Sequence, residues 1–263
     1  MGADLERAGA TGRERPVTAA GRSDTGPVRT ANEDHWHIDA GRGMFIVADG
    51  MGGHQAGEVA AHLAVAEVVA DLVASAHESF AWPLGRDEHQ PRVANRLTHA
   101  LRRANDAVYA AGVADPALMG MGTTLTVLII DGGLASIGSV GDSRAYLVRG
   151  SGIEQLTHDD TWLASVLGRD GAREAAARAH PMRHVLTSVI GARETSRPEV
   201  VTLAVGPGDV LVLATDGLHN VVEDASIGHL VRAQGPEAAA DALVAAALSG
   251  GTTDNVTVVV VHA

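Results

Sequence analysis

Two apolar runs near the C-terminal end of the chain constrain the fold most, because they lack the alternation of a strand with one exposed face. Val210-Leu211-Val212-Leu213 and Val258-Val259-Val260-Val261 are apolar at every position. Successive side chains of a strand point to opposite faces of its sheet, so such runs are typical of strands covered on both faces. Two stacked sheets with helices packed on their outer faces would provide that cover.

The remaining sequence switches between helical and strand periods. Apolar residues recur every three or four positions from Gly57 to Ala76 and from Val93 to Val108, which predicts two helices. The expected core-facing stripes are Val59, Leu63, Ala66, Val69 and Val73 in the first helix, and Val93, Leu97, Leu101, Ala104 and Val108 in the second. Runs rich in β-formers at residues 124–130, 134–140 and 144–148 predict an antiparallel meander.

The first 22 residues show no hydrophobic period, and we expect them to be a flexible tail too short to fold, followed by one domain over residues 23–263. A polar stretch at about residues 160–195 is expected to form a flap within this domain. The tail lacks the apolar segment of a secretory signal, and no later apolar run approaches membrane-spanning length. These features predict a cytoplasmic monomer with no membrane contact.

The composition excludes several kinds of chemistry. A net charge of −12 argues against nucleic acid as a partner, because proteins that follow a phosphate backbone present a basic surface. All 20 basic residues are Arg, which excludes mechanisms that need a catalytic or phosphate-binding Lys. The absence of Cys excludes a thiolate zinc site and a cysteinyl-phosphate intermediate.

Four aspartates stand at predicted strand ends beside small residues: Asp49, Asp142, Asp216 and Asp254. Any one of them alone would most simply cap a turn or a helix. If the strand ends converge, the four charges would repel one another unless cations neutralised them. Carboxylate and carbonyl ligands select hard divalent ions such as Mg²⁺ or Mn²⁺, and two such ions can activate a water and clamp a phosphoryl oxygen.

Short motifs surround these aspartates in a fixed order along the chain. They are Ser23-Asp24 with Gly26, Arg29 to Asn32-Glu33-Asp34, Val47-Ala48-Asp49-Gly50-Met51-Gly52-Gly53-His54, Gly122-Thr123-Thr124, Gly141-Asp142-Ser143-Arg144, Leu156-Thr157-His158-Asp159, Val185-Leu186-Thr187 with Ile190-Gly191, Thr215-Asp216-Gly217-Leu218, and Asp254-Asn255-Val256-Thr257. From about Ser23 to Val261, the sequence resembles the metal-dependent type-2C (PPM) serine/threonine phosphatases in their bacterial form. It departs from them at Asp160, where many members have His, and at Thr215, where Ser is common.

The resemblance implies an α+β fold: a four-layer α-β-β-α sandwich of two mainly antiparallel sheets flanked by helices, with a flap subdomain. It also implies a set of ligands for two central Mn²⁺ or Mg²⁺ ions. Asp49 would bridge the two ions, the backbone carbonyl of Gly50 would bind the second, and Asp216 and Asp254 would hold the first.

Further site residues follow from the same resemblance. Asp34, with Glu33, would bind waters of the second ion, and Asp142, with Asp216, would bind a third, weaker ion. Arg29 matches the arginine that grips the substrate phosphate, because its planar fork suits two phosphate oxygens; a solvated surface Arg is the alternative.

His54 has two readings. Its position in the glycine-rich segment matches the proposed general acid that protonates the leaving serine or threonine oxygen. It is also one of 13 His residues and could be a plain loop residue.

The expected activity is hydrolysis of phosphoserine and phosphothreonine monoesters by direct attack of a metal-bridging water, with phosphorylated proteins as partners, including a Ser/Thr kinase or its substrates. A catalytically retired domain that only binds or senses a phosphoprotein is the alternative. A metal-dependent phosphodiesterase is a third reading, which the acidic balance of the chain disfavours.

Overall fold

The computed structural model describes residues 17–52, 56–77, 79–83, 85–167, 181–182 and 185–263. In these ranges the strands form two antiparallel sheets. The first sheet has the order β1 (Thr18–Asp24), β11 (Val256–His262), β10 (Val210–Ala214), β7 (Arg144–Arg149) and β8 (Gly152–Gln155). The second has the order β2 (Asp34–Asp39), β3 (Met44–Met51), β5 (Leu125–Asp131), β6 (Leu134–Val140) and β9 (Glu199–Ala204), with β4 (Gly122–Thr123) paired to β3.

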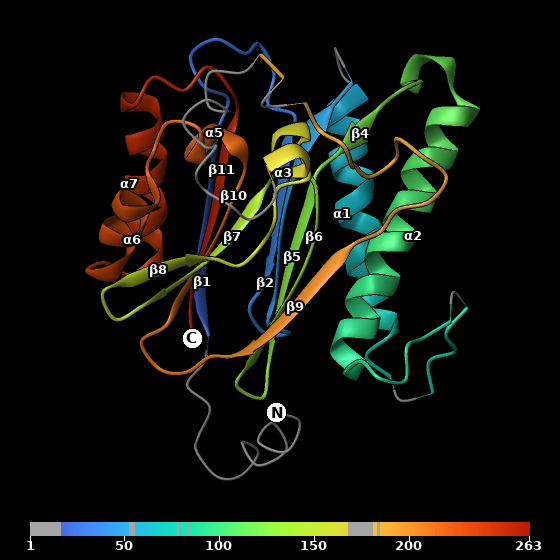
Figure 1. Cartoon of the computed structure of the whole chain (residues 1–263), viewed down its shortest axis with the longest axis horizontal. Coiled ribbons are helices and arrows are strands. Elements are labelled where there is room, and N and C mark those ends of the chain that lie inside the picture. The colour runs from blue at the N-terminus through green and yellow to red at the C-terminus, as the bar shows by residue number, and fades with distance from the viewer. Residues whose placement is uncertain (1–16, 53–55, 78, 84, 168–180, 183–184) are drawn as a thin grey trace.

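Helices cover the outer face of each sheet. The described helices are α1 (Ala56–Ala74), α2 (Arg92–Ala114), η1 (Pro116–Leu118), α3 (Trp162–Leu167), α5 (Asp216–His219), α6 (Asp224–Arg232) and α7 (Pro236–Ser249). Figure 1 shows α6 and α7 on one side, the two sheets in the middle and α1 and α2 on the other side. The expected α-β-β-α sandwich is therefore confirmed.

The two unbroken apolar runs lie where both of their faces are covered. In β11, Val258 and Val260 pack under the helices, whereas Val259 and Val261 face the layer between the sheets. β10 divides in the same way, with Leu211 facing that layer. All four valines of the run in β11 are fully buried, which explains why it needs no polar position.

The predicted start of the domain at Ser23 is wrong by five residues. β1 begins at Thr18 and pairs with β11 along its whole length, from Thr18 opposite His262 to Asp24 opposite Val256. The sequence did not reveal this strand because its small residues give no hydrophobic period. One of them, Gly21, has to be small, since a Cβ there would lie 2.7 Å from the Trp36 ring. Residues 1–16 of the expected tail lie outside the described residues.

Of the predicted three-stranded meander, only the hairpin of the first two strands is confirmed. β5 pairs with β6, but β7 belongs to the other sheet and pairs with β10 and β8. The chain crosses between the sheets at Gly141, whose φ of 104° favours glycine. The hydrophobic pattern could not reveal this crossing, because β7 is apolar whichever sheet it joins.

The first long helix forms as predicted but buries another face. Val59 and Val73 of the expected stripe remain more than a third exposed, and the buried positions are Ala56, Gly57, Ala60, Ala61, Ala64, Val65, Val68 and Leu72. These small residues lie against both β3 and α2. The stripe predicted for α2 is buried at Leu97, Leu101, Ala104 and Val108, as expected.

In the described ranges, we find no helix with the length and apolar character needed to cross a bilayer.

Candidate metal centre

Five of the predicted site aspartates meet at one end of the sandwich. Asp34 is the first residue of β2 and lies directly opposite Asp49 of β3 in the strand register. Asp216 begins α5 just after β10, and Asp254 stands two residues before β11. Asp142 lies on the crossing from β6 to β7. Strand ends of both sheets thus contribute carboxylates to the same place, and we call these five aspartates the acidic cluster.

The pKa values of these carboxyl groups show how strongly they affect one another. Burial, and then the charges of Asp34, Asp216, Asp142 and Asp254, raise the pKa of Asp49 well above its usual value. Burial raises the pKa of Asp34 to about 7 against the hydrogen bonds that it accepts. The pKa of Asp142 rises to about 7 through burial and then the charge of Asp216. Burial and the charge of Asp254 raise the pKa of Asp216 to about 6. The protein therefore gathers negative charge here that the described residues neutralise only in part, through the ion pair of Arg29 with Asp254.

Two carboxylate oxygens in the cluster suit a cation. Oδ1 of Asp34 and Oδ1 of Asp216 are buried and have no hydrogen-bond partner among the described residues. Because a buried oxygen without a partner destabilises the fold, and because cations relieve repulsion between carboxylates, divalent ions fit both features. In the described residues, no three Asp, Glu, His or Cys side chains are already arranged to coordinate an ion. The argument for divalent ions therefore rests on these two oxygens and on the repulsion between the carboxylates.

Neighbouring threonines orient two of the carboxylate residues, Asp34 and Asp49. Thr215 Oγ1 donates to Asp34 Oδ2 at 2.9 Å and itself accepts from the backbone N–H of Thr257 at 2.9 Å. Thr123 Oγ1 donates to the carbonyl of Asp49 at 2.9 Å, and Asp49 N donates to Thr124 Oγ1 at 3.0 Å. Sequence reasoning assigned no role to these hydroxyls, although all three threonines stand in the quoted motifs.

Asn255 is a further residue that sequence reasoning left without a role. It is 5% exposed. Its Oδ1 accepts from Glu33 N at 2.8 Å, and its Nδ2 donates to the carbonyls of Thr25 and Ala31 at 2.8 and 2.9 Å. The side chain therefore ties the segment before β2 to the start of β11. Its position directly after Asp254 was the only signal in the sequence.

Arg29 lies in the segment that Asn255 holds. Its Nη2 donates to Asp254 Oδ2 at 2.6 Å, while about half of its side chain stays exposed, at 53%. The structure thus brings Arg29 to the rim of the acidic cluster with donors left for a ligand, rather than leaving it as an isolated surface residue.

Gly50 and Glu33 lie close together beside Asp49. Gly50 N donates to the carbonyl of Glu33 at 3.2 Å, and a Cβ at Gly50 would collide with the carbonyls of Gly57 and Glu33. A Cβ at Gly57 would in turn collide with Glu33 Oε2. Only glycines allow this approach of the α1 start to the cluster. His54 and Gly53 lie outside the described residues.

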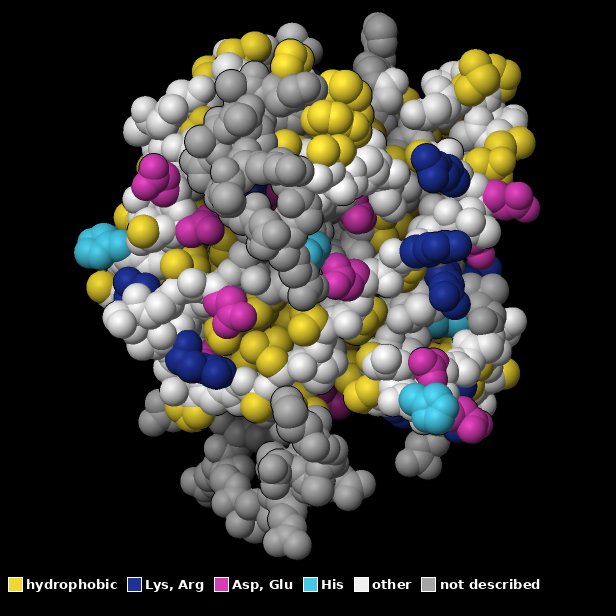
Figure 2. Space-filling view, viewed as in Figure 1, with side chains coloured by type: hydrophobic (Ala, Val, Ile, Leu, Met, Phe, Trp, Pro, Cys, Tyr) yellow, Lys and Arg dark blue, Asp and Glu magenta, His cyan; other side chains and the backbone are white. Residues whose placement is uncertain are grey.

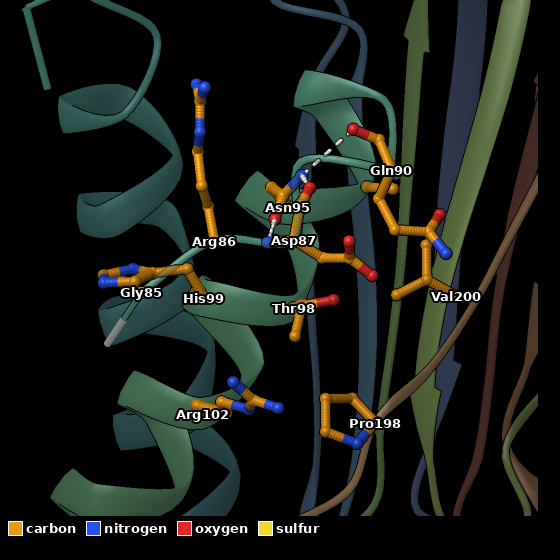
Figure 3. Close-up of a pocket in the computed structure, with 11 residues that line it drawn as sticks. Gly85, Arg86, Asp87, Gln90, Asn95, Thr98, His99, Arg102, Pro198 and Val200 are labelled. Atoms are coloured by element: carbon orange, nitrogen blue, oxygen red, sulfur yellow. Dashed lines mark hydrogen bonds between the residues drawn. The ribbon is translucent and has the colours of Figure 1, made fainter. Parts of the chain in front are cut away.

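A separate hollow, of about 420 Å³, lies between the N-terminal half of α2, residues 85–90 and β9. Figure 3 shows Thr98 and Arg102 of α2 on one side and Pro198 and Val200 on the other. Asn95 ties the loop to α2 by donating to the carbonyls of Asp87 and Gln90. The lining includes no member of the acidic cluster.

Comparisons with known proteins point to one family. The sequence model of protein phosphatase 2C matches residues 28–248. The chain is 38% identical over 243 residues to the serine/threonine protein phosphatase PstP of Mycobacterium tuberculosis, covering 92% of this chain and 44% of that protein. It is 35% identical over 243 residues to the protein phosphatase PhpP of Streptococcus pneumoniae, covering 91% and 94% of the two chains. The chain thus spans less than half the length of PstP.

A solved structure matches the fold. The catalytic domain of the serine/threonine protein phosphatase PstP, in complex with two manganese ions, superposes with a TM-score of 0.76 and 35% identity, covering 94% of this chain and 97% of that one. The match of the family model to most of the chain, the relatives and this structure agree with one another. The chain belongs to the protein phosphatase 2C family.

Proposed function

We propose that the chain is a metal-dependent protein serine/threonine phosphatase that hydrolyses phosphoserine and phosphothreonine monoesters. The observation that carries this proposal is the convergence of five aspartates in a chain of the protein phosphatase 2C family, with raised pKa values at Asp34, Asp49, Asp142 and Asp216 and two unpartnered carboxylate oxygens. The naming of the relatives as serine/threonine protein phosphatases supports the substrate class.

The residues of the cluster would each bind a different ion or set of ions. Asp49 would bridge two ions, with the carbonyl of Gly50 on the second, and Asp216 and Asp254 would hold the first. Asp34 and Glu33 would act through bound waters, and Asp142 with Asp216 would hold a third, weaker ion. Bound ions of this kind supply a water of lowered pKa as nucleophile and neutralise phosphoryl charge.

The remaining residues act on the phosphate and the leaving group. Arg29, held at the rim by Asp254, would bind two phosphate oxygens through its fork and align the phosphorus with the cluster. His54 would donate a proton to the leaving serine or threonine oxygen. The polar stretch at about residues 160–195, of which residues 168–180 and 183–184 lie outside the described residues, would form a flap.

We further propose Mn²⁺ or Mg²⁺ as the ions, a cytoplasmic monomer as the acting form, and phosphoproteins that include a Ser/Thr kinase or its substrates as partners. Nucleic acid fits poorly, since the chain carries a net charge of −12. On the face shown in Figure 2, the arginines are interspersed with acidic side chains.

Two assays test the proposal, each with added Mn²⁺ and after exhaustive dialysis against chelator. One follows the release of phosphate from a phosphothreonine peptide, and the other follows the release of an alcohol from a phosphodiester, whose hydrolysis leaves a phosphomonoester. We expect Mn²⁺-dependent release from the peptide alone, because carboxylates by themselves do not generate hydroxide at neutral pH. Full turnover in chelator would exclude the metal mechanism. Binding of the peptide without release would favour the retired domain, and release from the diester would favour a phosphodiesterase.

A further inference from the structure

The turn that carries Asp142 depends on hydrogen bonds from other parts of the chain for its conformation. It crosses between the two sheets at residues 141–143. Gly141 has a φ of 104°, and a Cβ there would lie 2.7 Å from the side chain of Thr124, so glycine is required. Glycine also gives the backbone more conformational freedom than any other residue. The direction of the Asp142 carboxylate therefore depends on the bonds that hold this turn.

On one side, the second sheet and α5 hold the turn. Ser143 shares a 2.7 Å hydrogen bond with Thr124, and Thr126 Oγ1 donates to the carbonyl of Ser143 at 2.8 Å. His219 Nε2 donates to the carbonyl of Asp142 at 3.1 Å. These bonds fix Asp142 and the residue after it, but not Gly141.

On the other side, Asp160 holds Gly141 by both of its backbone groups. Asp160 Oδ2 accepts from Gly141 N at 3.0 Å, and Asp160 N donates to the carbonyl of Gly141 at 2.9 Å. Two bonds from one residue restrict the rotation that glycine would otherwise allow. The side-chain bond is the one that a substitution can remove.

Asp160 is itself anchored in a short backbone ladder. Its carbonyl accepts from Thr187 N at 2.7 Å, and Thr161 forms a bridge with Leu186. Trp162 N donates to the carbonyl of Val185 at 2.8 Å. The carboxylate thus reaches from this ladder to the crossing turn, where its hydrogen bond goes to a backbone N–H and not to a proposed ligand side chain.

We propose that Asp160 is a positioning residue of the phosphatase reaction: its carboxylate holds the Gly141 N–H and so fixes where Asp142 points. The proposal rests on the proposed function. It accounts for an Asp at a position where the resemblance leads one to expect His, because a carboxylate oxygen accepts the amide hydrogen without depending on a tautomer.

The test compares Asp160→Ala, which removes the acceptor, with Asp160→Asn, which keeps one acceptor oxygen. For a phosphothreonine peptide at saturating Mn²⁺, we expect Asp160→Ala to lower kcat about tenfold with KM unchanged, since a misplaced group in the site costs rate rather than binding. Asp160→Asn should keep most of kcat. In metal-free protein, the Gly141 amide should exchange with solvent about tenfold faster in Asp160→Ala than in wild type or Asp160→Asn.

A double variant separates positioning from general damage. If Asp160 acts through Asp142, adding Asp160→Ala to Asp142→Ala should lower kcat by less than about twofold more, because the two effects are then not independent. Asp209→Asn is the matched control, since Asp209 Oδ2 also accepts a backbone N–H, that of Gly206, at the far end of the sandwich. It should leave kcat unchanged.

Three outcomes would overturn the proposal: equal losses in Asp160→Ala and Asp160→Asn, multiplicative losses in the double variant, or an unchanged exchange rate at Gly141. If Asp160→Ala does not fold, Asp160→Asn still tests the proposal. That variant should fold and keep most of its kcat, and a loss of kcat in folded Asp160→Asn would contradict the proposal. A wild-type protein without phosphatase activity would refute the proposed function instead, and the exchange measurement would remain valid.

Discussion

The two ends of the β-sandwich both carry aspartates beside strand ends, but at the acidic end the described residues pair only one of the five aspartates, Asp254, with an arginine. β10 has Asp216 after its last residue and Asp209 before its first. Asp209 receives two hydrogen bonds from Arg149, at 2.8 and 2.7 Å, and these bonds lower its pKa. Burial and a neighbouring carboxylate raise the pKa of Asp216 to about 6.

β2 repeats the contrast. Asp39 at its end is bound by Arg42 at 2.6 Å, which lowers the pKa of Asp39, whereas the pKa of Asp34 at its start rises to about 7 through burial. The same residue type at the same kind of position therefore has a lowered pKa beside an arginine at one end and a raised pKa at the other. The deciding factor is whether the protein supplies the counter-charge or leaves that task to bound cations.

Substituting the two aspartates that flank β10 should give the largest difference between the ends. We expect Asp216→Asn to lower kcat on a phosphopeptide by at least about 10³-fold, because it weakens the metal site that would generate the nucleophile. Asp209→Asn, the matched control at the other end of β10, should change kcat by less than about twofold, because Asp209 bonds to Arg149 and Gly206 and not to a residue of the acidic end. Circular dichroism should show both variants folded. Near-native turnover of Asp216→Asn at saturating Mn²⁺ would mean that Asp216 is only a turn residue. The proposed functional difference between the two ends would then be wrong.

Asp142 offers a sharper test within the acidic end. If it holds only the third ion, Asp142→Ala should lower kcat by about 10- to 100-fold, because that ion would help to orient a water or the leaving group. Calorimetry should still detect tight binding of two Mn²⁺ ions by the variant, since Asp49, Asp216 and Asp254 remain. Loss of all Mn²⁺ binding would make Asp142 a central ligand, and full activity would make the crossing turn a mere connection.

The smallest expected effect is a difference in how pH acts on the two ends. Without metal, the raised pKa values of Asp34 and Asp142, about 7, and of Asp216, about 6, mean that the folded state binds more protons than the unfolded state above pH ~4. Stability should therefore fall as pH rises from ~4 through 7. The lowered pKa values of Asp209 and Asp39 act in the opposite direction, and their contribution is lost as pH falls below ~4.

Thermal unfolding followed by circular dichroism measures this difference. We expect the Tm of metal-free protein to be at least about 4 °C lower at pH 8 than at pH 5, and Mn²⁺ to restore it at pH 8. In Asp216→Asn the fall should be smaller, because one titrating group is gone. A Tm that is flat between pH 5 and 8 would show that the acidic end is not strained by its charges.

The two long helices show how far the hydrophobic pattern alone could be trusted. In α2, charged residues separate the apolar positions, and the predicted stripe from Leu97 to Val108 is buried. In α1, alanines and valines occupy most positions, so the pattern predicted a helix but not its orientation. Packing against β3 and α2 at once selected the small residues, because they let the backbones approach closely.

The sequence by itself determined that apolar strands must be covered on both faces and which aspartates stand beside their ends, because side-chain period and motif order are local properties. Tertiary structure decided that β7 leaves the hairpin of β5 and β6 for the other sheet, and that Asn255, Thr215 and Asp160 hold the segments that carry the proposed ligands. Each of these contacts joins residues that lie far apart along the chain or in different elements. A hydrogen bond depends on where two atoms meet in space, and a single sequence records only which atoms are present.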